Sequence, residues 1–333
     1  MYVLGIETSC DETSASVVKN GASVLSNEIA SSLSFHKKYG GIVPEIAFRK
    51  QLETIAPVVE SSLADAGITL KDIGLISVTD GPGLLGSLVV GISFAKALSL
   101  STGIPLLGVN HLQSHIFASF LEKNKPEFPF IALIISGGHS SLFYVKDFDK
   151  IEIIGFTKDD ACGEAFDKVA KMLGLGYPGG PVIEQKGKQG NAESVRFSCL
   201  NKHDHLGFSF SGIKTAVLYH IRDNQPRKSA LNPRFVRDVS ASFQKAVIDT
   251  LIKKAFAACK HKRTPNLVIG GGVAANNKLR EQFFSSASGR GVKVFFPSLK
   301  YCMDNAGMVA CLGYYLFKKG YRSDLSLNVK FDK

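Results

Sequence analysis

The sequence contains no tryptophan and only six cysteines among 333 residues. The cysteines stand apart without a CxxC pair, which argues against a zinc ribbon and against a disulfide framework. We therefore expect reduced thiols and a cytoplasmic protein. The sequence also lacks a run of the about 20 apolar residues that a membrane-crossing helix needs, because its longest nearly uncharged stretch, residues 84–95, ends at Lys96.

The sequence also has no excess of acidic residues and no pattern typical of a secretory leader at its start. The first residues form an apolar strand pattern, residues 2–6, and Glu7 follows at once, so we expect no signal peptide. The formal net charge is +11. Such a charge favours a polyanionic partner, most commonly nucleic acid, although a basic enzyme without such a partner would show the same balance.

What the sequence does contain is a repeated plan. Residues 3–25 have the pattern of a strand, a polar turn, a second strand, an Asn20-Gly21 hairpin and a third strand, and residues 130–154 repeat it. After helical material, each copy is followed by a strand that ends in glycines, at residues 75–83 and 266–272. Because the chain also exceeds the about 250–300 residues of one core, we predict two related α/β domains with a boundary near residues 123–127.

The apolar spacing predicts helices in the second half of the chain. Residues 236–262 form an amphipathic pattern, and residues 304–319 a second one that begins with Asp304 in an N-cap-like place. The segment Tyr177 to Pro181 is rich in glycine and proline and is predicted to be a shaped loop. Residues 185–207 and 222–237 are predicted to be loops or inserts with basic residues.

A histidine pair is the first candidate for chemistry. His111 and His115 stand at positions i and i+4 of a predicted helix, so both imidazoles project from one side and could hold one metal ion, or they are surface or capping histidines. Leu112 follows the first histidine, so the general base of a zincin protease is absent. Asp304 is the best third ligand, unless it is a plain N-cap. Two histidines and one carboxylate would leave positions open for a substrate.

Small residues and a carboxylate mark a second candidate site. The turn at residues 136–139 could bring backbone N–H groups close to a ligand, or it is simply a tight hairpin turn. Asp167 stands near the start of a helix, where it could bind ribose hydroxyls or only complement the helix dipole. Residues 270–276 form a glycine-rich wall suited to a base or ribose. Neither a GxGxxG nor a GxxxxGK[ST] motif is present.

Taken together, these motifs resemble those of the TsaD/Kae family of tRNA adenosine threonylcarbamoyltransferases, in order and over residues 3–317. The motifs are Gly5-Ile6-Glu7-Thr8-Ser9-Cys10-Asp11-Glu12-Thr13, Asn110 to His115, Ser136-Gly137-Gly138-His139, Gly163 to Lys168 with Tyr177 to Pro181, Phe208-Ser209-Phe210-Ser211-Gly212-Ile213-Lys214, Gly271 to Asn276 and Cys302-Met303-Asp304-Asn305.

The resemblance implies an ASKHA fold, the α/β fold of actin, Hsp70 and sugar kinases, with two duplicated domains around a central cleft. We place the N-terminal domain at residues 1–125, with a helix of about residues 304–320 packing back on it, and the C-terminal domain at residues 126–303. The implied reaction transfers a threonylcarbamoyl group from threonylcarbamoyl-adenylate to N6 of adenosine 37 in tRNAs that read codons starting with A. Alternatives are an ASKHA-fold small-molecule kinase and a non-catalytic nucleotide-binding scaffold.

The resemblance also implies roles for individual residues. One Fe²⁺ or Zn²⁺ per subunit would be held by His111, His115 and Asp304, which would meet across the groove between the domains, and no protein nucleophile would be needed. Substrate contacts would come from Ile134, Ile135, Ser136, Gly137, Gly138, Asp167, Gly180, Glu184 and Asn276, with Ser9, Cys10 and His139 as further candidates for phosphate or acyl contacts.

Partners follow from the same resemblance. The tRNA anticodon stem-loop would be held by lysines and arginines of residues 185–207, 222–237 and 260–263 through phosphate contacts. A degenerate paralogue, TsaB, and a small ATPase, TsaE, would act with the chain, and no membrane would be involved.

Overall fold

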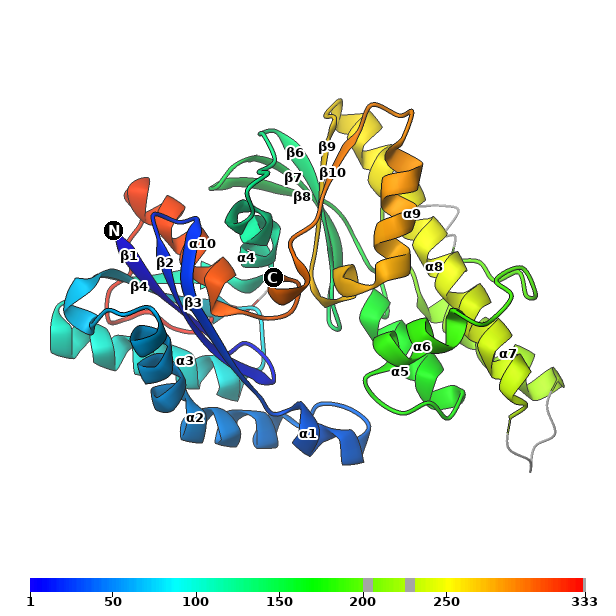
Figure 1. Cartoon of the computed structure of the whole chain (residues 1–333), viewed down its shortest axis with the longest axis horizontal. Coiled ribbons are helices and arrows are strands. Elements are labelled where there is room, and N and C mark those ends of the chain that lie inside the picture. Colours follow the sequence, from blue (N-terminus) through cyan, green and yellow to red (C-terminus); the bar gives the residue numbers. More distant parts are fainter. Residues whose placement is uncertain (200–205, 225–230, 332–333) are drawn as a thin grey trace. The chain divides into compact units, whose positions relative to one another are not determined.

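The computed structural model describes residues 1–199, 206–224 and 231–331. The chain divides into two compact units, of which the first comprises Met1–Lys125 with Pro297–Lys333 and the second Pro126–Phe296. Figure 1 shows a sheet with flanking helices in each unit. The two similar α/β units that the strand pattern predicts are therefore present in the fold.

The first unit is built on a five-stranded sheet in the order β3-β2-β1-β4-β5. Strands β1, β2 and β3 are antiparallel neighbours, whereas β4 and β5 run parallel to β1. Asn20 and Gly21 connect β2 to β3 with φ angles of 53° and 69°, as a tight hairpin turn requires. The strands are β1 (Tyr2–Glu7), β2 (Glu12–Lys19), β3 (Ser23–Ser31), β4 (Ile73–Gly81) and β5 (Leu106–Asn110).

Helices cover both faces of this sheet, because successive side chains of β1 point to opposite sides. Leu4 and Ile6 join a core with residues of α2 and α3. Gly5 faces α10, where a Cβ would lie 2.2 Å from the Ala306 carbonyl oxygen, so only glycine allows this close packing. The helices are α1 (Leu33–His36), α2 (Pro44–Asp65), α3 (Leu85–Thr102), α4 (His111–Phe117) and α10 (Ala306–Lys318), with 3₁₀ turns at Lys37–Tyr39, Leu70–Asp72, Ala118–Leu121 and Leu299–Tyr301.

Helix α3 is the one described helix that is long and apolar enough to cross a membrane by length and composition. Its residues Leu88, Ile92 and Ala95 are buried in the core of the first unit. A core helix of a folded domain meets the same criteria, so packing against the sheet accounts for its apolar character.

The second unit repeats the strand order of the first. Its sheet runs β10-β9-β6-β7-β8, with β6, β7 and β8 antiparallel and with β9 and β10 parallel to β6. This identity of topology confirms the predicted duplication. The strands are β6 (Phe130–Ile135), β7 (Ser140–Asp147), β8 (Lys150–Phe156), β9 (Asn266–Gly270) and β10 (Lys293–Phe295).

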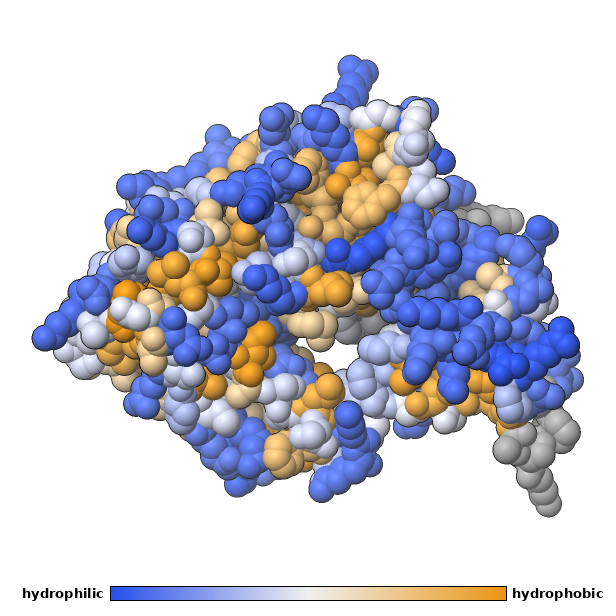
Figure 2. Space-filling model, in the orientation of Figure 1, coloured by the Kyte–Doolittle hydropathy of each residue, from blue (hydrophilic) through white to orange (hydrophobic). Residues whose placement is uncertain are grey.

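The helices of the second unit carry mostly hydrophilic side chains on the face that Figure 2 displays. Beneath this surface, Phe166 of α5 and Phe243 of α8 pack edge to face, with ring centroids 5.0 Å apart. The helices are α5 (Cys162–Met172), α6 (Gly179–Gly187), α7 (Ser211–Asn224), α8 (Pro233–Lys262) and α9 (Asn277–Ala287), with a 3₁₀ turn at Gly272–Ala275.

Some predicted loops are helical. The segment Tyr177 to Pro181 was expected to be a loop throughout, but α6 begins at Gly179 with Pro178 as its N-cap residue. Proline is tolerated in a first helical turn because the N–H that it lacks has no partner there. The expected basic inserts are also shorter, since Arg222 belongs to α7 and residues 233–237 to α8. Their remaining parts include residues 200–205 and 225–230, which lie outside the described residues.

Candidate active site

The histidine pair lies where strand β5 ends and helix α4 begins. Asn110 ends the strand and caps the helix, because its Oδ1 accepts a hydrogen bond of 3.0 Å from the backbone N–H of Gln113. His111 and His115 are therefore on the first turns of α4, as the spacing predicted, and both side chains are buried. Burial rules out the alternative of two surface histidines.

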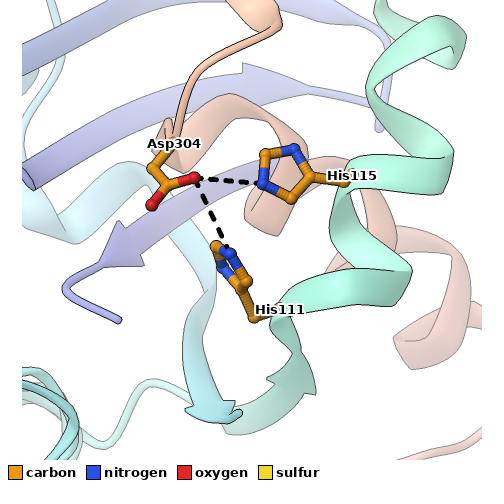
Figure 3. A group of neighbouring side chains, drawn as sticks. All are labelled: His111, His115 and Asp304. Carbon is orange, nitrogen blue, oxygen red and sulfur yellow. Dashed lines mark hydrogen bonds and ion pairs between the residues drawn. The ribbon is translucent and has the colours of Figure 1, made fainter. Parts of the chain in front are cut away.

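Asp304 points at both imidazoles, as Figure 3 shows. Its Oδ1 lies 3.0 Å from His115 Nε2 and 3.7 Å from His111 Nε2. The alternative that Asp304 caps the last helix is wrong, because Asn305 is the N-cap of α10 and its side chain accepts from the backbone N–H of Met308. Asn305 thus caps the helix, and the Asp304 carboxylate points toward the two histidines.

Glu7 and Ser9 fix the orientation of the first imidazole. His111 Nδ1 lies 3.2 Å from Glu7 Oε2 and 3.1 Å from Ser9 Oγ, while its Nε2 faces Asp304. Burial would raise the pKa of the Glu7 carboxyl, but the charge of His111 and the hydrogen bonds from His111 and Ser9 outweigh it, so this pKa is lowered. A charged carboxylate behind a histidine is the usual support of a metal-ligating imidazole.

The three side chains fit one metal ion. Their ligand atoms all lie within 4.8 Å of one another. Two ligand atoms that share a tetrahedral ion lie about 3.3 Å apart, and the observed separations of 3.0 and 3.7 Å bracket this value. Two nitrogens and one carboxylate oxygen are donors that suit zinc or iron.

All three candidate ligands belong to the first unit. His111 and His115 lie within Met1–Lys125 and Asp304 within Pro297–Lys333. The expectation that they meet across a groove between two domains is therefore wrong. The chain returns to the first unit before residue 304, so a carboxylate distant in sequence is a local neighbour of α4.

The turn after β1 places more ionisable groups near Asp304. Burial, together with the negative charges of Asp304 and Asp11, raises the pKa of the Cys10 thiol, so the thiol stays protonated. Burial and the charge of Asp304 raise the pKa of Asp11. Burial and the charge of Asp11 raise the pKa of Glu12 to about 7, which sequence reasoning missed because a burial effect leaves no motif.

In the second unit, the predicted glycine turn lies between β6 and β7. Ser136 closes it, because its backbone N–H donates to the His139 carbonyl at 2.8 Å and its Oγ accepts from the His139 N–H at 3.2 Å. Nothing lies within 4 Å of where a Cβ would stand on Gly137 or Gly138, so packing within the protein does not explain these glycines. Ile134 and Ile135 precede the turn on β6 and are fully buried, so only their backbone could meet a ligand.

Helices α5 and α6 meet beside this turn. Gly163 at the start of α5 packs on the turn, because its backbone N–H donates to the Ser136 carbonyl at 3.1 Å. Asp167 Oδ1 accepts from the backbone N–H of Gly179 at 2.6 Å, so its carboxylate holds the start of α6. Gly180 has open space where a side chain would stand.

Glu184 and Asn276 lie at a second junction, between α6 and α9. Glu184 Oε1 accepts from the backbone and side-chain nitrogens of Asn277 at 3.1 Å. Asn276 caps α9 through the N–H of Leu279 and donates to Gln244 at 2.9 Å. Both residues thus have structural partners already.

The motif at residues 208–214 anchors helix α7. Asp159 accepts from the hydroxyl of Ser211 at 2.7 Å and from the backbone N–H of Phe210 at 2.7 Å. The next residue, Asp160, is paired with Lys168 of α5 at 2.8 Å and with Lys214 of α7 at 2.6 Å. These contacts give the motif a positioning role beside the start of α5.

Comparisons with known proteins show which family the chain resembles. Residues 23–311 match the family model described as "TsaD: tRNA N6-adenosine threonylcarbamoyltransferase". Proteins named tRNA N6-adenosine threonylcarbamoyltransferase from Clostridium perfringens and Clostridium kluyveri are 49% and 48% identical, each over 98% of this chain and 96% of the relative.

A solved structure of T. kodakarensis HypF is similar in fold alone. It matches 98% of this chain and 48% of its own, with a TM-score of 0.64 and 15% identity. Together with the duplicated sheets, this likeness confirms the ASKHA fold.

Proposed function

The chain belongs to the TsaD family of tRNA N6-adenosine threonylcarbamoyltransferases, and we propose that it modifies adenosine 37 of tRNAs that read codons starting with A. It is a transferase that acts on tRNA. The observation that carries this conclusion is 49% identity over 98% of the chain to a relative with that name. The relative is matched over nearly its whole length, so no catalytic domain is left unmatched.

We propose threonylcarbamoyl-adenylate as the donor. The N6 amine of adenosine forms a bond to the carbamoyl carbon, the bond from that carbon to the phosphate oxygen breaks, AMP leaves, and N6 loses a proton. Adenylate is a good leaving group, so a covalent enzyme intermediate is unnecessary. The raised pKa of Cys10, caused by burial and by the charge of Asp304, supports this direct transfer because the thiol is not the reactive thiolate.

His111, His115 and Asp304 would hold one Fe²⁺ or Zn²⁺ ion. When bound, such an ion polarises a carbonyl oxygen as a Lewis acid. Glu7 and Ser9 hold the His111 ring through Nδ1, and Asn110 holds the first turn of α4. The chain itself thus orients the ligands from β1 and β5, which are rigid parts of the first sheet.

The second unit would bind the adenylate. Open space at Gly137, Gly138 and Gly180 would let the adenylate come close to the protein backbone. The backbone N–H groups of Gly137 and Gly138 would donate to its phosphate. Asp167 holds the start of α6, and Glu184 and Asn276 lie at the start of α9. All three would contact ribose or base after a change of hydrogen-bond partner. Ile134, Ile135 and Ser136 would contribute backbone groups, and Ser9, Cys10 and His139 would approach the acyl or phosphate group.

The tRNA anticodon stem-loop is the proposed macromolecular substrate, and the cytoplasm the proposed location. By family resemblance we propose the paralogue TsaB and the ATPase TsaE as partners. The alternatives of a small-molecule kinase and of a non-catalytic scaffold are not favoured by the named relatives. The histidine-rich cluster also differs from a kinase site, because Mg²⁺ prefers oxygen ligands.

Nucleoside mass spectrometry of tRNA from cells depleted of this protein tests the function. We expect threonylcarbamoyladenosine to disappear and other modified nucleosides to keep their levels, with recovery on expression of the wild-type chain. Depleted cells that retain the nucleoside in full, with depletion verified, would show that the chain does not make it.

A further inference from the structure

A basic groove lies on the second unit where α8 ends. The hollow has a volume of about 850 Å³ and is lined by the last turns of α8, the end of α9 and the segment that leads into β9. We propose that this groove, formed by Lys253, Lys260, Arg263 and Arg290, binds phosphates of the tRNA substrate outside the modified nucleotide. The inference rests on the proposed function for the identity of the nucleic acid.

The cations of the groove are available to a ligand. Lys253, Lys260, Arg263 and Arg290 are exposed, and no ion pair joins any of them to a carboxylate among the described residues. Neighbouring lysines behave differently, since Lys262 is paired with Glu152 at 2.7 Å. A row of unpaired cations is costly through mutual repulsion unless an anion binds there.

The one carboxylate among the lining residues is already neutralised. Asp249 lies at the rim, and Lys245 pairs with it at 2.7 Å. The net field inside the groove is therefore positive, which favours a polyanion over an acidic or neutral small molecule.

Apolar side chains line the base of the groove, and one of them stacks against a cation. Ile252, Phe256 and Cys259 line the groove and are buried. The Arg290 guanidinium lies over the Phe256 ring, 5.0 Å from its centroid. A guanidinium stacked in this way keeps its N–H edge free for bidentate contact with phosphate.

The position of the groove suits a long substrate. Pro265 lines it, and strand β9 runs from the next residue, Asn266, to Gly270, directly before the candidate ligand residues 271–276. At about 3.3 Å per residue, these residues span about 17 Å. A ligand that reaches both places must extend over several nucleotides, as an anticodon stem does and an adenylate does not.

The groove differs from the basic stretches expected from sequence. It uses Lys260 and Arg263, which lie in one of those stretches, and adds Lys253 and Arg290, which lie in none. Residue 290 follows α9 and reaches the groove only through the packing of α9 against α8.

The test is binding of an unmodified tRNA transcript to the full chain over a salt series from about 50 to 200 mM. The variant is Lys260→Gln/Arg290→Gln, which leaves the helix-capping Arg263 in place. The matched control, Lys150→Gln/Lys171→Gln, removes the same charge from exposed sites of the same unit. Each phosphate contact contributes about 0.7–0.9 to the slope of log K against log salt.

We expect the groove variant to bind tRNA about tenfold more weakly and with a slope smaller by about 1.5, while the control and the charge-retaining Lys260→Arg variant bind like wild type. Equal weakening in groove variant and control, or no weakening in the groove variant, would overturn the proposal. So would weakened binding of poly-glutamate with unchanged tRNA binding. Wild-type protein that leaves adenosine 37 unmodified in a complete system would refute the function and not the groove.

Discussion

The two units share one sheet topology and differ in what they place at the ends of equivalent strands. After β1 and β5, the first unit presents ionisable side chains, among them Glu7 and His111, that are buried and in contact. After β6, the second unit presents two glycines, Gly137 and Gly138, with open space where a side chain would stand. Duplication therefore supplied two similar scaffolds, of which the first is suited to hold an ion and the second to hold a nucleotide.

The largest expected effect is the loss of activity on substitution of Asp304, compared with substitution of its neighbour Asn305. Asp304→Ala removes a proposed metal ligand, and we expect transfer to fall at least about 1,000-fold with little change in stability, since loss of a positioned metal costs several kcal/mol of transition-state stabilisation. Asn305→Ala removes the cap of α10 and should cost about 1 kcal/mol of stability. Transfer assays and urea unfolding of both variants measure this. Equal loss of activity in the two variants at a temperature where both are folded would contradict the assignment.

The second expected effect lies in the glycine turn of the second unit. Gly138→Ala meets no protein atom within 4 Å, so folding should be unchanged, but the added methyl group should raise the KM for the adenylate donor about 10- to 100-fold. Gly163→Ala is the control, because its Cβ would lie 2.7 Å from the Ser136 carbonyl and should reduce stability. A Gly138→Ala enzyme with wild-type KM would show that the ligand does not approach this turn.

The smallest effects should be opposite pH dependences of stability in the two units. In the first unit, burial and the charge of Asp11 raise the pKa of Glu12 from 4.5 to about 7, so the folded state binds the extra proton and stability falls as the pH rises across this range. Glu12→Gln should remove this fall and gain about 1–3 kcal/mol at pH 8. Urea unfolding between pH 4 and 8 measures it, and an unchanged slope would contradict the assigned pKa.

Asp160 of the second unit should show the reverse sign. Burial raises the pKa of its carboxyl, but the hydrogen bonds and charges of Lys168 and Lys214 outweigh it and lower that pKa below 3.8. Its stabilisation is thus complete above pH 3.8 and is lost as the pH falls through the lowered value. Asp160→Asn should lower the free energy of unfolding by about 1 kcal/mol at pH 7. It should also weaken the decrease of this free energy at acidic pH.

Much of this arrangement could be predicted from the sequence because it depends on local patterns. Strand alternation, the Asn20-Gly21 turn and the i, i+4 spacing of His111 and His115 each determine structure over a few residues. The contact of His111 with Glu7 could not be predicted, because it depends on β1 and β5 lying in one sheet with β4 between them.

The failed predictions have equally physical causes. Asp304 and Asn305 are both good N-cap residues, and only the contacts of α10 with the first sheet decide which of them caps. At Gly179, the hydrogen bond to Asp167 supports a helix start that composition alone argues against. Long-range packing, which no spacing rule contains, decided both cases.

The most direct test is the metal content of the purified chain, measured by mass spectrometry of the elements under anaerobic conditions. We predict about one iron or zinc ion per wild-type chain and almost none in His111→Ala/His115→Ala. Asn305→Ala removes the cap of α10 and two hydrogen bonds to the carbonyls of Tyr301 and Met303, but it keeps all three proposed ligands and should retain most of the metal. A double histidine variant that keeps the full complement of metal would contradict the assignment of the ion to His111, His115 and Asp304.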